Sequence, residues 1–371
     1  MLWPSELVIF RGETPAEARA LMERIVALCG ADNRFSLCDL AYSLARYDAA
    51  SPIQYSVVAD TVAGLLARID ALLSERKDND VFALEALDGK VAFLFPGQGS
   101  QRVDMAADLF ALFPRMRRLL DAHPEYERIL FPPAAVTPEE KKAQRTAITD
   151  TLNAQPLLGL VDLGIAELLR DFGVEADMLC GHSYGELPAL CFAGALAADD
   201  LLDLSRQRAQ SVLDAVGDDP GRMVAVSTDY ETLAALLEDE SEVWAVNLNA
   251  PQQTVVAGAS KAIEAFCARL KEAEAGFTEL NVACAFHSPL LASAEAYFAK
   301  ALENVDFREP HLPLWSNTTA QPYPQTPAAI KKRLAEHVVS PVRFTDEVEA
   351  MYADGARVFI EAGPGSVLTG L

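Results

Sequence analysis

The stretch CGHSYGELPAL at 180–190 constrains the fold of this chain more than any other feature. It places Ser183 in the spacing Gly-x-Ser-x-Gly, between an apolar run at 176–180 that predicts a strand and a helical pattern at 184–194. This spacing at a strand-to-helix turn is typical of a nucleophilic serine on a tight elbow. Because the bare spacing often arises by chance, its position between strand and helix carries the prediction.

Alternating strand and helix patterns along the chain predict an α/β protein with two domains. Residues 1–88 have the pattern of a small α/β unit, and residues 89–371 that of a larger layered domain. Within the larger domain, the elements at about 220–285 follow the order β-α-β-β-α-β, which is typical of a ferredoxin-like unit. Ligands of layered α/β folds gather beyond the carboxyl ends of strands, so we expect the functional site there.

Several segments of the larger domain carry specific structural expectations. The apolar run at 91–95 predicts a buried strand that leads into a glycine-rich loop. Periodicity predicts helices over 104–120 and 157–173 and a strand over 277–285. The stretch at 131–147 is rich in proline and then in charge, which indicates an excursion on the surface.

Charge and cysteine content exclude some classes of function. The net charge is −23, with 54 acidic and 31 basic residues, which argues against a nucleic-acid partner or an anionic membrane surface. The six cysteines form no CxxC pair, which favours reduced thiols and a cytoplasmic protein. We find neither a signal peptide nor an uncharged apolar run long enough to span a membrane.

A serine nucleophile needs a base, and histidine is the usual one. The chain has five candidates: His123, His182, His287, His311 and His337. Two of them adjoin proline in segments that read as exposed loops, His182 is adjacent to Ser183 on a turn where side chains diverge, and His337 lies near a predicted helix end. His287 follows a predicted strand, as Ser183 does, and we therefore predict that it is the base.

Acyl chemistry at a serine also needs donors for the developing oxyanion. The backbone N–H of Tyr184, directly after the nucleophile, is one natural donor. The loop Gly97-Gln98-Gly99 after another strand can supply the second, with Gln98 the best candidate. Taken alone, this loop could equally be a plain turn.

Five sequence blocks together resemble a known family. They resemble, in the same order, blocks of the acyltransferase domains of type I polyketide and fatty acid synthases and of stand-alone malonyl-CoA:acyl carrier protein transacylases. The blocks are FPGQGSQ (95–101), GHSYGE (181–186), NAPQQTVVAG (249–258), AFHSP (285–289) and EAGPGSVLTG (361–370). The resemblance covers about 90–371 and implies an α/β-hydrolase-like large subdomain with an inserted ferredoxin-like small subdomain. Residues 1–88 resemble the linker domain between ketosynthase and acyltransferase.

The resemblance implies a role for each matching residue. Ser183 would carry the acyl ester, and His287 would act as its base and later as its acid. Gln98 and Tyr184 would form the oxyanion hole through their backbone N–H groups. A main-chain carbonyl near a helix end would orient the histidine in place of an aspartate, and His337 matches that position.

The resemblance also implies a pocket for a malonyl group. Arg208, in the helix after the elbow helix, would pair with the free carboxylate of the malonyl group. On its own, an arginine at this place would more commonly be a solvated helix charge, as neighbouring Arg206 could be. Other residues implied at the pocket are Gln155, Asn249, His182 and Phe286. The bulky Phe286 favours malonyl over methylmalonyl, although Cys284 departs from the His-Ala-Phe-His pattern of malonyl-selective members.

Activity and partners follow as expectations from the same resemblance. The substrates would be malonyl-CoA and an acyl carrier protein that bears phosphopantetheine, with an adjoining ketosynthase domain and neither a metal nor another cofactor. The stretch FPPAAV, the segment 148–156 and Tyr184 look most like iterative synthases of the enediyne or polyunsaturated-fatty-acid type. Two alternatives remain open: a serine esterase or thioesterase of α/β-hydrolase type, and a catalytically silent docking module.

Overall fold

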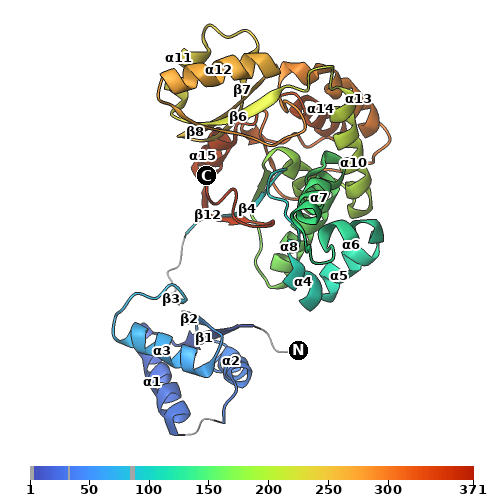
Figure 1. Ribbon diagram of the computed structural model, residues 1–371. Coiled ribbons are helices and arrows are strands. Elements are labelled where there is room, and N and C mark those ends of the chain that lie inside the picture. The colour runs from blue at the N-terminus through green and yellow to red at the C-terminus, as the bar shows by residue number, and fades with distance from the viewer. Residues whose placement is uncertain (1–3, 32–33, 84–87) are drawn as a thin grey trace. The chain divides into compact units, whose positions relative to one another are not determined.

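The chain divides into two compact units between Asp88 and Gly89. The structure, a computed structural model, describes residues 4–31, 34–83 and 88–371 (Figure 1). Each unit has its own hydrophobic core.

In the described part of residues 1–88, the N-terminal unit has a three-stranded antiparallel sheet and three helices. Its strands run in the order β1 (Glu6–Arg11), β2 (Ile53–Ala59) and β3 (Val81–Ala83). Its helices are α1 (Pro15–Ala31), α2 (Leu37–Arg46) and α3 (Val62–Leu73). The side chains of Ser36 and Thr61 cap α2 and α3 by accepting backbone N–H bonds, which fixes where each helix begins.

The larger unit is built on a parallel sheet with strand order β12-β4-β5. These strands are β12 (Ala356–Glu361), β4 (Lys90–Phe95) and β5 (Met178–Gly181). The apolar sequence of β4 suits a strand covered on both faces. Phe95 is paired with Gly181 in the register of β4 and β5, so the loops that follow these two strands emerge at the same edge of the sheet.

Helices cover this sheet, and several differ from the expected boundaries. The predicted helix over 104–120 is two helices, α4 (Ala107–Leu112) and α5 (Pro114–Asp121), because a proline starts the second one. After α5 the chain forms α6 (Pro124–Leu130), whose N-cap is His123. The predicted surface excursion contains α7 (Pro138–Thr149), which Thr137 and Glu140 start with a capping box.

The central helix of the larger unit is α8 (Thr151–Asp171), which begins before the predicted residue 157 because Asp150 caps it. By length and composition α8 could cross a membrane. However, 72% of its apolar stretch is buried inside the protein, as in a core helix. The elbow leads through a 3-10 turn (Ser183–Gly185) into α9 (Glu186–Phe192), and α10 (Ala198–Asp214) packs against α8.

A four-stranded antiparallel sheet forms the second layer, with strand order β7-β8-β6-β9. Its strands are β6 (Arg222–Ser227), β7 (Val243–Ala250), β8 (Gln253–Gly258) and β9 (Gly276–Glu279). The helices α11 (Tyr230–Leu237) and α12 (Ser260–Glu272) lie on one face of it (Figure 1). The prediction of a strand over 277–285 was too long, because β9 is an edge strand that pairs only with β6 and ends at Glu279.

The remaining elements return the chain to the parallel sheet. They are the 3-10 turn Pro289–Leu291, α13 (Ala292–Leu302), β10 (Trp315–Ser316), β11 (Gln321–Pro322), α14 (Pro327–His337) and α15 (Phe344–Ala353). The segment between α14 and α15 contacts the four-stranded sheet, where the backbone N–H of Leu248 donates to the carbonyl of Val342 at 2.8 Å. Val342 also packs in the core cluster with Ala92 and Leu94 of β4, so this segment contacts both sheets.

Candidate active site

The turn that carries Ser183 is a strained, tightly packed elbow. Ser183 has a φ of +51°, in the left-handed region that residues with a side chain seldom adopt. A Cβ at Gly181 would lie 2.1 Å from the carbonyl carbon of Gly185, and one at Gly185 would lie 2.0 Å from the carbonyl oxygen of Phe95. Only glycine fits at both positions, which explains the spacing on either side of the serine.

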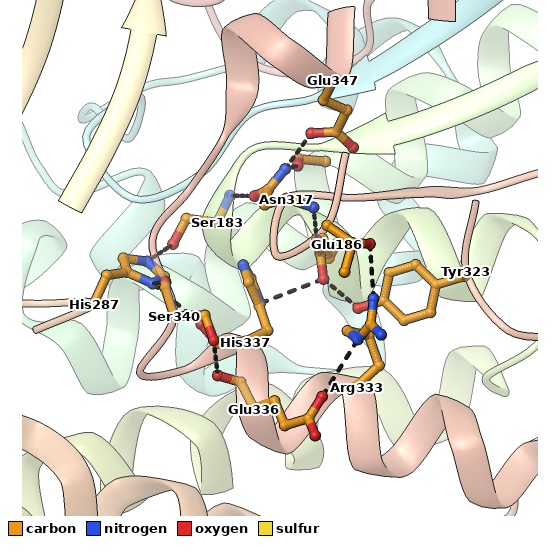
Figure 2. Close-up of polar contacts among 12 residues, drawn as sticks. Ser183, Glu186, His287, Asn317, Tyr323, Arg333, Glu336, His337, Ser340 and Glu347 are labelled. Carbon is orange, nitrogen blue, oxygen red and sulfur yellow. Dashed lines mark hydrogen bonds and ion pairs between the residues drawn. The ribbon is translucent and has the colours of Figure 1, made fainter. Parts of the chain in front are cut away.

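The elbow presents the hydroxyl of Ser183 to His287. The distance between Ser183 Oγ and His287 Nε2 is 2.6 Å. On the other side of the ring, Nδ1 lies 2.9 Å from the carbonyl oxygen of Ser340 and 3.2 Å from that of His337 (Figure 2). An Nδ1–H that donates to these carbonyls leaves Nε2 as the acceptor for the serine proton. The two groups therefore have the geometry of a nucleophile and its base.

Burial keeps the ring of His287 neutral. Removal from water, with smaller contributions from the charges of Arg208 and His182, lowers the pKa of His287 to about 3. The ring is therefore free to take a proton at neutral pH. The carbonyl of His337 lies where the resemblance implies, but the shorter contact is with Ser340, which the sequence did not identify. The His337 carbonyl is at the last residue of α14, where it also accepts from the backbone N–H of Ser340 at 3.3 Å, and Ser340 lies just beyond the helix.

Behind the elbow lies a buried polar network that sequence reasoning missed (Figure 2). Asn317 is its hub: Oδ1 accepts from the backbone N–H of Ser183 at 2.6 Å, and Nδ2 donates to the carbonyl of Gly181 at 2.7 Å and to the carboxylate of Glu347. The backbone N–H of Asn317 donates to Glu186 Oε1 at 2.7 Å. This network holds the elbow from its inner side.

Glu186 links the same network to the helix end that orients His287. It accepts a hydrogen bond from the phenol of Tyr323, and its Oε2 lies 3.3 Å from His337 Nδ1. Burial raises the pKa of Glu186 to about 7 and that of Glu347 well above its usual value. The GHSYGE block ends at Glu186 but gives it no role, and no motif contains Asn317 or Glu347. Glu and Asn are usually exposed, and these three residues converge here from separate segments.

The loop that carries Gln98, one expected oxyanion donor, lies against the turn that carries Tyr184, the other. A Cβ at Gly97 would lie 2.4 Å from the carbonyl oxygen of His182 and 3.5 Å from the backbone nitrogen of Tyr184, so the glycine loop runs directly against the elbow. The backbone N–H of Gln98 has no acceptor among the described residues. Tyr184 is at the start of a 3-10 turn, where N–H groups lack helical acceptors.

A cavity of about 230 Å³ opens over the serine. Its lining includes nine of the residues named from the sequence: Gln98, Gln155, His182, Ser183, Tyr184, Arg208, Asn249, Phe286 and His287. Apolar side chains complete the wall, among them Met223 and Val255 from the four-stranded sheet. The structure therefore brings together every predicted side chain except His337, which lies behind His287 and contributes its carbonyl.

Arg208 places a positive charge in this cavity. The residue is only 3% exposed, and its guanidinium forms no hydrogen bond or ion pair within the described residues. Burial lowers its pKa to about 10, so the group stays charged at neutral pH. Arg206 on the same helix is exposed and donates to Tyr126 at 2.7 Å. A buried cation that has no anionic partner in the protein can pair with an anion that enters the cavity.

The remaining pocket residues are held by short contacts. Gln155 Nε2 lies 3.4 Å from Gln98 Oε1, and Gln98 Nε2 donates to Thr151 at 3.2 Å. His182 Nε2 lies 2.8 Å from Asn249 Oδ1, so its ring turns away from the serine as expected. Among the described residues, no group of three or more His, Cys, Asp or Glu side chains could hold a metal ion.

Comparisons with known proteins show the family of this chain. The acyl transferase domain family matches residues 92–370. A malonyl CoA-acyl carrier protein transacylase of Bacillus subtilis (strain 168) is 35% identical over 288 residues, which covers 76% of this chain and 89% of the relative. One polyunsaturated fatty acid synthase polypeptide of Thraustochytrium is 33% identical over 311 residues, which covers 77% of this chain but 11% of that protein.

Solved structures of acyltransferases are similar to this chain in fold. The acyltransferase domain from the second module of the salinomycin polyketide synthase has a TM-score of 0.75 at 29% identity, covering 100% of this chain and 85% of the other. An acyl carrier protein S-malonyltransferase from Vibrio cholerae has a TM-score of 0.68 at 33% identity, covering 76% of this chain and 92% of the other.

Proposed function

Since the chain belongs to the acyl transferase domain family, we propose that it transfers a malonyl group from malonyl-CoA to the phosphopantetheine thiol of an acyl carrier protein. An ester on Ser183 is the intermediate. The transfer would load extender units for polyketide chain growth. The names of the relatives, malonyl transacylases and synthases, support this reaction.

The observation that carries the proposal is the place of Arg208. Its buried guanidinium and the Ser183–His287 pair line one cavity. A malonyl thioester has a carbonyl for the serine and a free carboxylate for the cation, whereas a neutral ester has only the first. Paired hydrogen bonds from a guanidinium to a carboxylate are directional as well as strong.

The first half of the reaction forms the ester. Ser183 Oγ attacks the thioester carbonyl carbon while His287 Nε2 takes the serine proton. The negative charge that develops on the carbonyl oxygen is stabilised by the backbone N–H groups of Gln98 and Tyr184. The carbon–sulfur bond then breaks, and the CoA sulfur leaves with the proton from His287.

The second half reverses the first with another thiol. The phosphopantetheine thiol gives its proton to His287 and attacks the ester carbonyl. The bond to Ser183 Oγ breaks, and the oxygen recovers the proton from His287. The product is a malonyl thioester on the carrier protein, and the protein returns to its starting state without a metal or other resident cofactor.

Phe286 supports a preference for malonyl over methylmalonyl. It lines the cavity next to His287, where its ring would crowd an α-methyl branch. Cys284 is buried, and burial raises the pKa of its thiol to about 12, so it acts there as a small apolar side chain rather than as a second nucleophile.

The two alternatives lack comparable support. An esterase of neutral substrates has no use for a buried cation in its acyl pocket, and the family relationship does not favour it. A silent docking module has no need for Ser183, His287 and Arg208 around one cavity.

The wider setting is part of the same proposal. We assign residues 1–88 as a linker domain between ketosynthase and acyltransferase, in a cytoplasmic synthase of iterative type. The larger unit would combine an α/β-hydrolase-like subdomain with a ferredoxin-like one, which the strand order β7-β8-β6-β9 supports.

Mass spectrometry of the intact protein after incubation with malonyl-CoA tests the reaction. We expect a malonyl adduct that maps to Ser183, is absent from Ser183→Ala and disappears when an acyl carrier protein with phosphopantetheine is added. No adduct on the wild-type protein would overturn the proposal. An adduct lost to water but never to the carrier protein would identify a hydrolase instead.

A further inference from the structure

Tyr184 contributes a buried side chain as well as a backbone donor. The residue is 1% exposed, although it follows a serine that faces the cavity. Its ring centroid lies 5.9 Å from the Arg208 guanidinium carbon, within the range of a cation–π contact. Its phenol oxygen lies 2.7 Å from Ser205 Oγ. The sequence motif accounts for neither contact.

The direction of the phenol hydrogen bond follows from its partner. Ser205 Oγ donates its single proton to the carbonyl oxygen of Leu201 at 2.6 Å. The phenol of Tyr184 must therefore donate to Ser205 Oγ. Ser205 and Arg208 are both on α10, three positions apart and so on the same face of the helix. The phenol thus ties the elbow to the helix turn that carries the cation.

A glycine on the neighbouring helix leaves room for this bond. A Cβ at Gly159, in the middle of α8, would lie 2.3 Å from the Tyr184 phenol oxygen. No side chain other than hydrogen fits there while the phenol is in place. The phenol therefore occupies a fitted space between α8 and α10.

We propose that Tyr184 is a positioning residue for Arg208, a role that rests on the proposed function above. The side chain of an arginine without hydrogen-bonded partners can rotate about several bonds. Ordering it when a ligand binds costs conformational entropy. The ring beneath the guanidinium and the tie to α10 order the side chain in advance. The backbone N–H of Tyr184 is also a proposed oxyanion donor. Tyr184 would therefore position the group that binds the carboxylate and stabilise the charge on the oxyanion.

Four variants test this role: Tyr184→Phe, Ser205→Ala, Gly159→Ala and the double variant Tyr184→Phe/Gly159→Ala. Each is acylated with malonyl-CoA and, separately, with neutral p-nitrophenyl acetate, and the ratio of the two kcat/KM values is compared with that of the wild type. The exposed Tyr297, converted to Phe, is the matched control that should leave the ratio unchanged.

We expect Tyr184→Phe and Ser205→Ala to lower the malonyl-to-acetate ratio about tenfold, the size of one lost hydrogen bond. The loss should lie mainly in KM for malonyl-CoA. Gly159→Ala should lower the ratio further, and the double variant should recover part of that loss because the clashing oxygen is gone. Thermal unfolding of each variant identifies any that fail to fold.

The outcomes separate this inference from the proposed function. If the wild type forms a malonyl ester but Tyr184→Phe keeps the wild-type ratio, only the positioning role is overturned. The same holds if the double variant is no better than Gly159→Ala. If the wild type forms no malonyl ester, both proposals fail together.

Discussion

The side-chain oxygen of Asn317 accepts a hydrogen bond from the backbone N–H of Ser183 across 2.6 Å. The amide nitrogen of the same side chain donates to Gly181, on the other side of the turn. One buried side chain therefore holds both ends of an elbow whose serine has the unfavourable φ of +51°. Strain of this kind persists only where the surroundings fix it.

We predict that Asn317→Ala lowers the free energy of unfolding by about 1–3 kcal/mol, the cost of leaving buried backbone groups unpaired. Urea unfolding measures this, with the exposed Asn281→Ala in the same unit as the control. The rate of Ser183 acylation should fall as well, because the elbow relaxes. A variant as stable and as fast as the wild type would contradict the assigned role.

Arg208→Ala should lower kcat/KM for malonyl-CoA by about 10²-fold, the scale of a lost charged pair. Arg208→Lys should recover only part of the rate, since an ammonium cannot reproduce the paired geometry. Arg206→Ala, on the exposed side of the same helix, is the control. An equal loss in both alanine variants would mean that helix stability, rather than carboxylate binding, is being measured.

The depressed pKa of His287 predicts an unusual pH profile. An ordinary histidine loses its base form as pH falls through about 6.5, but burial lowers the pKa of His287 to about 3. The acylation rate should therefore stay nearly constant from pH 8 to about pH 5. Quenched-flow measurements of ester formation over that range check this. An inflection near pH 6.5 would show that the free ring titrates normally.

The buried carboxyl of Asp162 should make the free energy of unfolding depend on pH. Neither carboxyl oxygen has a hydrogen-bond partner among the described residues, and burial raises the pKa of Asp162 well above its usual value. As pH rises above about 3.9, the unfolded chain releases this proton while the folded protein keeps it, so folding stability falls. The variant Asp162→Asn has no carboxyl at this position, so its stability should not fall with pH for this reason.

We therefore expect the unfolding free energy of Asp162→Asn, relative to the wild type, to rise by about 1.4 kcal/mol per pH unit above that point, until the folded group itself ionises. Urea titrations of both proteins at several pH values measure the difference. A difference that does not change with pH would mean that the carboxyl is ionised in the folded protein.

Phe286→Ala should raise the ratio of methylmalonyl to malonyl ester about tenfold, since space for one methyl group is worth about 1–3 kcal/mol. Mass spectrometry after incubation with both thioesters gives the ratio. Phe172→Ala, at an exposed position, is the control. No change in the ratio would remove Phe286 as the source of selectivity.

The sequence predicted the parts of this site that a local motif or a short list of candidates identifies. Ser183 was identified by its flanking glycines, and His287 by elimination among five histidines. Asn317 and the role of Glu186, which ends the GHSYGE block, were missed because their partners come from distant segments, which no local pattern records. Ser340 was missed because it acts through a carbonyl, which every residue has. The helix boundary at Pro114 was missed because its proline begins a helix instead of interrupting one.

The two carbonyls that orient His287 have an evolutionary consequence. A point substitution at position 337 or 340 replaces a side chain and leaves the carbonyl oxygen where it was. The orientation of the base is therefore inherited with the path of the backbone after α14, not with the identity of any residue there. The weak point of such a site is a change of chain length directly after α14, where one residue inserted or deleted before position 340 would move the Ser340 carbonyl away from His287.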